Sequence, residues 1–255
     1  MSINSLGAAA KIGFVILLAQ GLAAEAAEVK LMSANPMTEV MKELGPQFER
    51  ATGHKLVIQY EVASVVKKRI DAGETFDVAI LLPPLIEDLI KQGKIDVGTR
   101  ADIARAGMGV GVRAGAPKPD ISSVEAFKHA LLNARSVAYS KVGASGVYFL
   151  GLLERLGIAE EMKPKLKPTP ADTLAKVVPN GEVEMIVVPI SVILVPGAEL
   201  VGPLPSELQT YINFVAGVGT GAKEPNAAQA LIKFLTSPAA AQVLKVKGME
   251  PGTPR

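Results

Sequence analysis

Short apolar runs alternate with segments of helical periodicity along most of the chain, and this alternation is the strongest constraint on the fold. Residues 29–32 predict a strand, and residues 37–52 predict a helix whose apolar side chains recur at helical spacing. Strands are also predicted at 56–60 and 77–82, each followed by a helical segment. Parallel strands joined by crossover helices produce this order, and the almost continuous apolar run at 77–82 is typical of a strand covered on both faces. The sequence therefore predicts an α/β fold.

Two glycine-rich, strand-like segments interrupt the alternation, at 107–119 and 211–221. We interpret them as the places where the chain crosses between two lobes. The predicted division gives residues 27–110 to a first lobe, 111–211 to a second lobe and 212–255 to a return segment of the first. Each lobe is expected to contain a mainly parallel sheet flanked by helices, with a cleft and a hinge between the lobes.

The N-terminal segment has the pattern of a cleavable export signal. Lys11 precedes an apolar run at 12–24, and Ala24-Glu25-Ala26 supplies the small-x-small pattern of a cleavage site. The run is shorter than the roughly twenty residues of a membrane-spanning helix. Residues 1–26 are therefore predicted to be a signal peptide that directs the protein to a Gram-negative periplasm. A buried N-terminal helix and a retained anchor remain as alternatives.

Composition argues against several classes of function. The 27 Lys and Arg residues nearly balance the 25 Asp and Glu residues, and no basic stripe is present, so nucleic acid is not an expected partner. The absence of Cys excludes disulfides, thiolate metal sites and cysteine nucleophiles. Two histidines, His54 and His129, have no metal-ligand spacing, so neither a metal nor a cofactor is expected.

Small polar residues follow several predicted strands, where an α/β sheet commonly binds its ligand. Helix N-termini at this edge offer backbone N–H groups and partial positive charge, which suit an anion. The same residues also suit helix caps, tight turns or core packing, and those interpretations stay open. The candidate ligand-binding residues are Ser33, Asn35, Ser64, Ser140, Ser145, Gly146, Val147, Tyr148 and Ser191.

Several longer stretches resemble the periplasmic molybdate-binding protein family, and the similarity extends over the whole chain after the signal. The stretches that carry it are FERATGH at 48–54, IDAGETFDV at 70–78, LIKQGKI at 89–95, LLERLGI at 152–158, VGPLPSEL at 201–208 and ALIKFLTSP at 230–238. The resemblance implies a two-lobed type II binding-protein fold, a monomer, a small anionic ligand and an ABC permease of the inner membrane as partner. It also matches Ser33 to a serine that contacts the oxyanion.

The chain departs from that family at two ligand positions. Serines of the second family loop fall on Val62 and Ala63, and Pro189-Ile190 replaces a tyrosine after the strand at 185–188. The loop at 143–148 instead resembles a divergent branch that includes aconitate isomerases. Two functions follow: a solute-binding protein that captures a molybdate-like oxyanion or a small carboxylate, or an isomerase that acts on a tricarboxylate. For the isomerase, the sequence offers Lys141, Glu61 and Lys67 as candidate catalytic residues.

Overall fold

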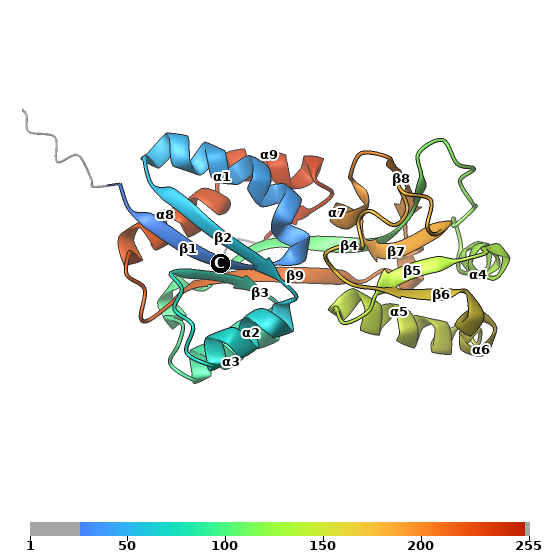
Figure 1. The fold of residues 1–255 in the computed structure, drawn as a ribbon, viewed down its shortest axis with the longest axis horizontal. Coiled ribbons are helices and arrows are strands. Elements are labelled where there is room, and N and C mark those ends of the chain that lie inside the picture. The colour runs from blue at the N-terminus through green and yellow to red at the C-terminus, as the bar shows by residue number, and fades with distance from the viewer. Residues whose placement is uncertain (1–25, 253–255) are drawn as a thin grey trace, which may run out of the picture.

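The computed structural model describes residues 26–252 as two lobes that lie side by side (Figure 1). Residues 1–25, which hold nearly all of the expected signal peptide, lie outside the described residues. The strands form one mixed sheet in the order β2-β1-β3-β9-β4-β7-β5-β6, and β8 and β10 both pair with β4. No helix in the described part of the chain is long and apolar enough to cross a bilayer.

The first lobe contains the N-terminal α/β units and both C-terminal helices. Its elements are β1 (Glu28–Ala34), α1 (Thr38–Thr52), β2 (Lys55–Glu61), α2 (Ala63–Asp71), β3 (Val78–Leu81), α3 (Pro83–Lys91), α8 (Pro225–Leu235), α9 (Pro238–Val246) and β10 (Glu250–Pro251). β1 pairs in parallel with β2 and β3, as the alternating pattern predicts. Val78–Leu81 is buried at every position, because helices cover both faces of the sheet.

Asp77 ties the return segment to the first lobe. Its carboxylate accepts hydrogen bonds from the backbone N–H of Lys30 at 2.7 Å, of Lys223 at 2.7 Å and of Glu224 at 3.2 Å. The side chain is buried, so these bonds replace the water that a carboxylate would otherwise need. One buried acid therefore joins β1 to the start of α8 across almost the full length of the sequence.

The second lobe is built from the middle of the chain. Its elements are α4 (Val124–Asn133), β5 (Val137–Ser140), α5 (Ala144–Arg155), α6 (Ala159–Met162), β6 (Leu166–Thr169), β7 (Met185–Pro189), α7 (Ile190–Ile193) and β8 (Ala198–Pro203). β5 pairs in parallel with both β6 and β7. Two clusters of buried apolar side chains lie in this lobe, separate from the cluster that fills the first lobe.

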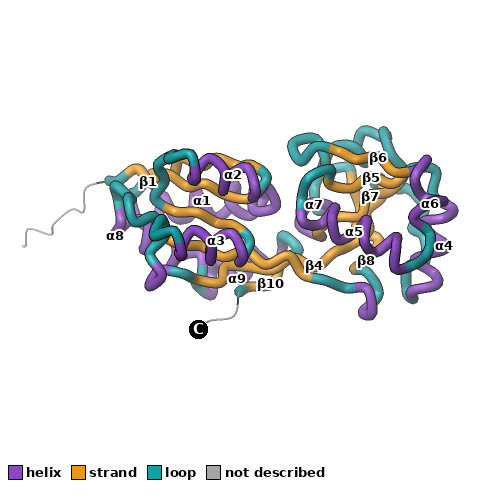
Figure 2. The backbone as a smooth tube through the Cα atoms, turned by 90° about the horizontal axis from the view of Figure 1, so that it is seen from below, coloured by secondary structure: helices purple, strands orange, loops and turns teal. Residues whose placement is uncertain are grey.

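Two long antiparallel strands, β4 (Ala101–Arg113) and β9 (Tyr211–Val218), connect the lobes (Figure 2). β4 pairs with β9 as far as Gly107 and with β7 from Met108 onward. The Gln209 side chain holds this junction, because it accepts from the Met108 N–H at 2.8 Å and donates to the Met108 carbonyl at 3.0 Å. The two crossing points therefore lie next to each other.

Candidate functional site

A cavity of about 610 Å³ lies between the two lobes, and residues from both lobes line it. Its size is in the range of small-molecule sites. Five of the serines and amides singled out from the sequence line this cavity: Asn35, Ser64, Ser140, Ser145 and Ser191. Much of the remaining wall is apolar, formed by Pro36, Leu82, Leu85, Leu174, Val192, Val195, Ile212 and Phe214 among others. The structure thus brings polar groups from four separate chain segments into one space.

The N-terminus of α2 supplies hydrogen-bond donors from the first lobe. Its N-cap, Val62, carries no side-chain oxygen that could accept from the first backbone N–H groups. Ala63 and Ser64, the first two helical residues, both line the cavity. The first N–H groups of a helix have no partner within the helix, and they carry partial positive charge. This helix start therefore suits a negatively charged group.

The N-terminus of α5 provides the matching arrangement in the second lobe. Its N-cap, Gly143, also lacks a side-chain cap, and Ala144 and Ser145 line the cavity. Ser140 fixes the turn before the helix by accepting a hydrogen bond from the Gly143 N–H at 3.0 Å. Gly146 lies against this turn: a Cβ there would come within 1.8 Å of the Ser140 carbonyl oxygen. Gly146 therefore allows the helix to start close to the strand end, although it does not itself line the cavity.

Ser191 is an unsatisfied donor in the wall of the cavity. The residue is only 3% exposed, and its Oγ has no hydrogen-bond partner among the described residues. An unpaired buried hydroxyl costs free energy, and such groups in native proteins call for an explanation such as a ligand or a trapped water. A ligand in the cavity can accept this hydrogen bond.

Tyr60 and an ion pair add further polar groups to the first-lobe wall. Lys42 Nζ lies 2.6 Å from Glu39 Oε1, and both residues line the cavity with Tyr60. Burial, together with the negative charge of Glu39, raises the pKa of Tyr60 to about 12. The phenol therefore remains protonated at neutral pH and can donate a hydrogen bond to a ligand.

Four other candidate ligand-binding residues lie outside this wall. Ser33 is fully buried in β1, and its Oγ donates to the neighbouring Ala34 carbonyl at 3.4 Å. Val147 is 73% exposed. The Tyr148 hydroxyl donates to the Leu208 carbonyl. Gly146 has the packing role given above.

The three candidate catalytic residues are not among the residues that line the cavity, although Glu61 and Lys141 are chain neighbours of residues that do. Lys67 bonds to Asp71 at 2.7 Å and to Asp88 at 2.5 Å, and these hydrogen bonds raise its pKa. Lys141 is exposed, and Glu61 is half-buried, but neither belongs to the residues that line the cavity. The described residues hold no group of three or more His, Cys, Asp or Glu side chains arranged to bind a metal ion.

Sequence reasoning missed several polar side chains that do line the cavity: Thr38, Glu39, Lys42, Tyr60, Asp172 and Lys176. Tyr60 had a usable signal, because it stands at the carboxyl end of a predicted strand. Asp172 and Lys176 had none, since they lie in an irregular segment between β6 and β7.

Two lobes, a pair of crossing strands and a cavity lined from both sides define a two-lobed solute-binding protein. Residues 29–250 match the model of the bacterial extracellular solute-binding protein family, and the chain belongs to that family, in its molybdate-binding type.

Similarity to individual proteins extends along nearly the whole chain. An aconitate isomerase from a Pseudomonas species is 31% identical over 243 residues, covering 88% of this chain and 92% of that protein. The molybdate-binding protein ModA of Azotobacter vinelandii is 30% identical over 245 residues, covering 92% of this chain and 95% of that protein. The solved structure of the Azotobacter vinelandii periplasmic molybdate-binding protein superposes with a TM-score of 0.75 at 20% identity, covering 89% of this chain and all of that one.

Proposed function

We propose that this protein captures a small anion with an apolar body, of the carboxylate type, between its two lobes. The observation that carries the proposal is Ser191: its buried Oγ lacks a partner within residues 26–252, and the residue lines the same cavity as the uncapped starts of α2 and α5. Serine hydroxyls and helix N-termini bind an anion without a fixed countercharge, which favours reversible capture. The apolar side chains around them suit a carbon skeleton better than a bare tetrahedral oxyanion.

Closure of the lobes would complete the site. The crossing strands are adjacent, so a small rotation there moves one lobe against the other as a unit. A ligand that contacts both lobes favours the closed form by its differential affinity for that form. The family and the predicted signal support a periplasmic monomer that presents the closed form to an ABC permease.

Binding can be tested directly with the chain that lacks residues 1–26. Isothermal titration against molybdate, sulfate, acetate, malonate and trans-aconitate should give a saturable, one-to-one signal for at least one carboxylate. The thermal midpoint should rise with it, because a ligand at a hundredfold excess over Kd stabilises the native state by about 2.7 kcal/mol. No binding to any of these anions would refute the proposal, and binding to molybdate alone would refute its carboxylate part in favour of a tetrahedral oxyanion.

A second candidate function is isomerisation of aconitate, which the 31% identity to an aconitate isomerase favours. The reaction moves one allylic proton: a base removes it from one carbon, the double bond shifts, and a proton returns at the other carbon. Within the cavity wall, Glu39 or Asp172 would act as the base and the Tyr60 phenol as a proton donor. Incubation with trans-aconitate, followed by chromatography for the cis isomer, separates turnover from binding alone.

A further inference from the structure

Four charged residues line the cavity, and each lobe contributes one carboxylate side chain and one lysine. Glu39 and Lys42 come from α1 of the first lobe, and Asp172 and Lys176 come from the irregular segment that precedes β7 in the second. The formal charges of these four residues therefore sum to zero. Whether the cavity favours an anionic ligand then depends on which of the two ammonium groups is free of an ion pair.

Lys42 is already neutralised by its neighbour. Its Nζ lies 2.6 Å from Glu39 Oε1, one helical turn earlier on α1. Lys176, in contrast, has no ion-pair partner among the described residues. Lys176 is therefore the cation of this wall that can pair with an incoming anion without first breaking an ion pair.

Hydrogen bonds and buried neighbours fix the backbone at Lys176. Its N–H donates to the Thr173 carbonyl at 2.8 Å, and its carbonyl accepts from the Asn180 N–H at 2.9 Å. Leu174 and Val177, on either side, are buried in the second lobe's smaller core cluster. The ammonium group therefore moves on a flexible side chain while its attachment point stays fixed.

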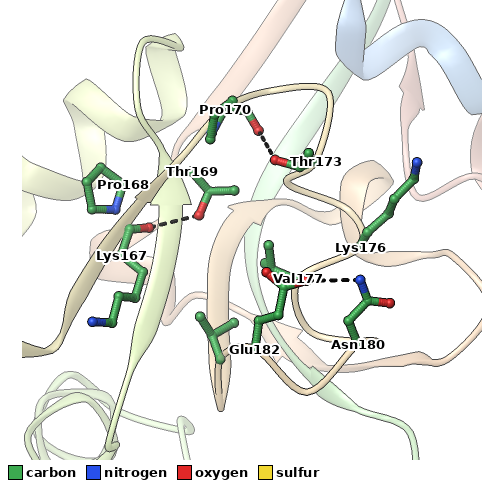
Figure 3. Close-up of a pocket in the computed structure, with 10 residues that line it drawn as sticks. Lys167, Pro168, Thr169, Pro170, Thr173, Lys176, Val177, Asn180 and Glu182 are labelled. Carbon is green, nitrogen blue, oxygen red and sulfur yellow. Dashed lines mark hydrogen bonds between the residues drawn. The ribbon is translucent and has the colours of Figure 1, made fainter.

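Lys176 also borders a second hollow of about 350 Å³ beside the same segment. Lys167, Asn180 and Glu182 line that hollow, and the end of Lys176 points away from Asn180 and Glu182 (Figure 3). The Glu182 carboxylate accepts a hydrogen bond from the Asn180 amide at 2.9 Å. Among the described residues no ion pair joins Glu182 to Lys176, and Lys176 also lines the interlobe cavity, so its ammonium is available there.

We propose that Lys176 is a specificity-determining residue that pairs with a second negative charge of the ligand, so that the site selects organic anions with two or more carboxylates. The inference rests on the proposed function and extends it. The uncapped helix starts and Ser191 hold one carboxylate, and Lys176, which lines the same cavity, pairs with another. Asp172, four residues earlier on the same segment, repels the ligand's carboxylates and so limits how strongly the site prefers ligands with several carboxylates.

The test is a charge series of ligands with similar carbon skeletons, titrated calorimetrically into the chain lacking residues 1–26. Butyrate, glutarate and propane-1,2,3-tricarboxylate carry one, two and three carboxylates. Lys176→Gln should weaken tricarboxylate binding by about 10-fold or more, the range of a charge-assisted hydrogen bond, and leave butyrate within about twofold. Asp172→Asn should act in the opposite direction and tighten the tricarboxylate by about threefold, as expected for a like charge removed near a protein surface.

Lys167→Gln is the matched control, because Lys167 borders the second hollow and does not line the interlobe cavity. It should bind all three ligands as the unaltered chain does. Equal tricarboxylate affinity in Lys176→Gln and the unaltered chain would overturn the inference. Equal weakening of all three ligands would also overturn it, because Lys176 would then act on closure rather than on a second charge. If the unaltered chain binds no anion at all, it is the proposed function that fails.

Discussion

Replacement of Ser191 by Ala should raise stability and lower affinity at the same time. The residue is 3% exposed and its Oγ has no partner in the described part of the chain, so the free protein bears the cost of a desolvated hydroxyl, about 1–3 kcal/mol. Removal of one oxygen leaves the Cβ in place and opens little space. We therefore expect the free energy of unfolding to rise by about 1 kcal/mol, which raises the midpoint of a chain of this size by about 2–4 °C.

The ligand should lose a hydrogen bond in the same variant. A hydrogen bond between a hydroxyl and a carboxylate contributes about 1.5–3 kcal/mol, so Kd should increase by about 10- to 150-fold. Urea unfolding without ligand measures the first effect, and calorimetric titration with the best-binding carboxylate measures the second.

Ser140→Ala is the matched control for this prediction. Ser140 also lines the cavity, but its Oγ already accepts from the Gly143 N–H at 3.0 Å. Its removal should lower the free energy of unfolding by about 0.5–1.5 kcal/mol. A loss of stability in Ser191→Ala as large as that in Ser140→Ala, or an unchanged Kd, would refute the reasoning about an unsatisfied hydroxyl.

Two further predictions concern the helix start and the phenol. Gly146→Ala should lower the free energy of unfolding, measured in urea, by about 1–3 kcal/mol or more, because the new Cβ would come within 1.8 Å of the Ser140 carbonyl oxygen. Gly151→Ala on the same helix is the control: its Cβ would meet no described atom within 4 Å, so the change should be neutral or stabilising. Tyr60, with its pKa raised from 10.0 to about 12, stays protonated longer in the folded than in the unfolded chain, so its contribution is complete below about pH 10 and decreases as the pH rises toward 12. At about pH 11 this loss amounts to about 1.4 kcal/mol. Between about pH 9.5 and 11, the free energy of unfolding of Tyr60→Phe should therefore fall less than that of the unaltered chain. If the two proteins lose stability equally over this range, the raised pKa of Tyr60 is contradicted.

The N-terminal half of the fold could be predicted well from the sequence, because its signals are local. Thr38–Thr52 repeats its apolar residues at helical spacing and ends at Gly53, whose φ of 79° is the left-handed conformation that glycine accepts readily. The strand at Val78–Leu81 is fully buried, as its continuous apolar run predicts.

Other elements differ from their local patterns because distant residues complete them. Residues 163–170, rich in Lys and Pro, predict a surface connection, yet Leu166–Thr169 forms the edge strand β6 beside β5. Proline is tolerated there, since an edge strand has one side without a partner. Ser122 suggests a capping box with Glu125, whereas Ser123 is the actual cap and accepts from the Ala126 N–H at 3.1 Å.

The candidate site was predictable only where its residues follow a predicted strand. Ser64 and Ser145 follow strands that end at the cavity, so the general rule for α/β sheets finds them. Lys67 cannot be assigned this way, because its ion pair with Asp88 depends on how α2 packs against α3, although its pair with Asp71 is local to α2. Lys176 needs the irregular segment to be placed first, and no periodicity describes that segment.

The central claim is that an anion binds between the lobes at the helix starts and Ser191. A crystal structure of the chain with its best-binding carboxylate tests this most directly. We expect the ligand in the interlobe cavity, with one carboxylate oxygen within hydrogen-bond distance of Ser191 Oγ and the backbone N–H groups at the start of α5. A ligand bound elsewhere, or one in the cavity that contacts neither group, would contradict the account.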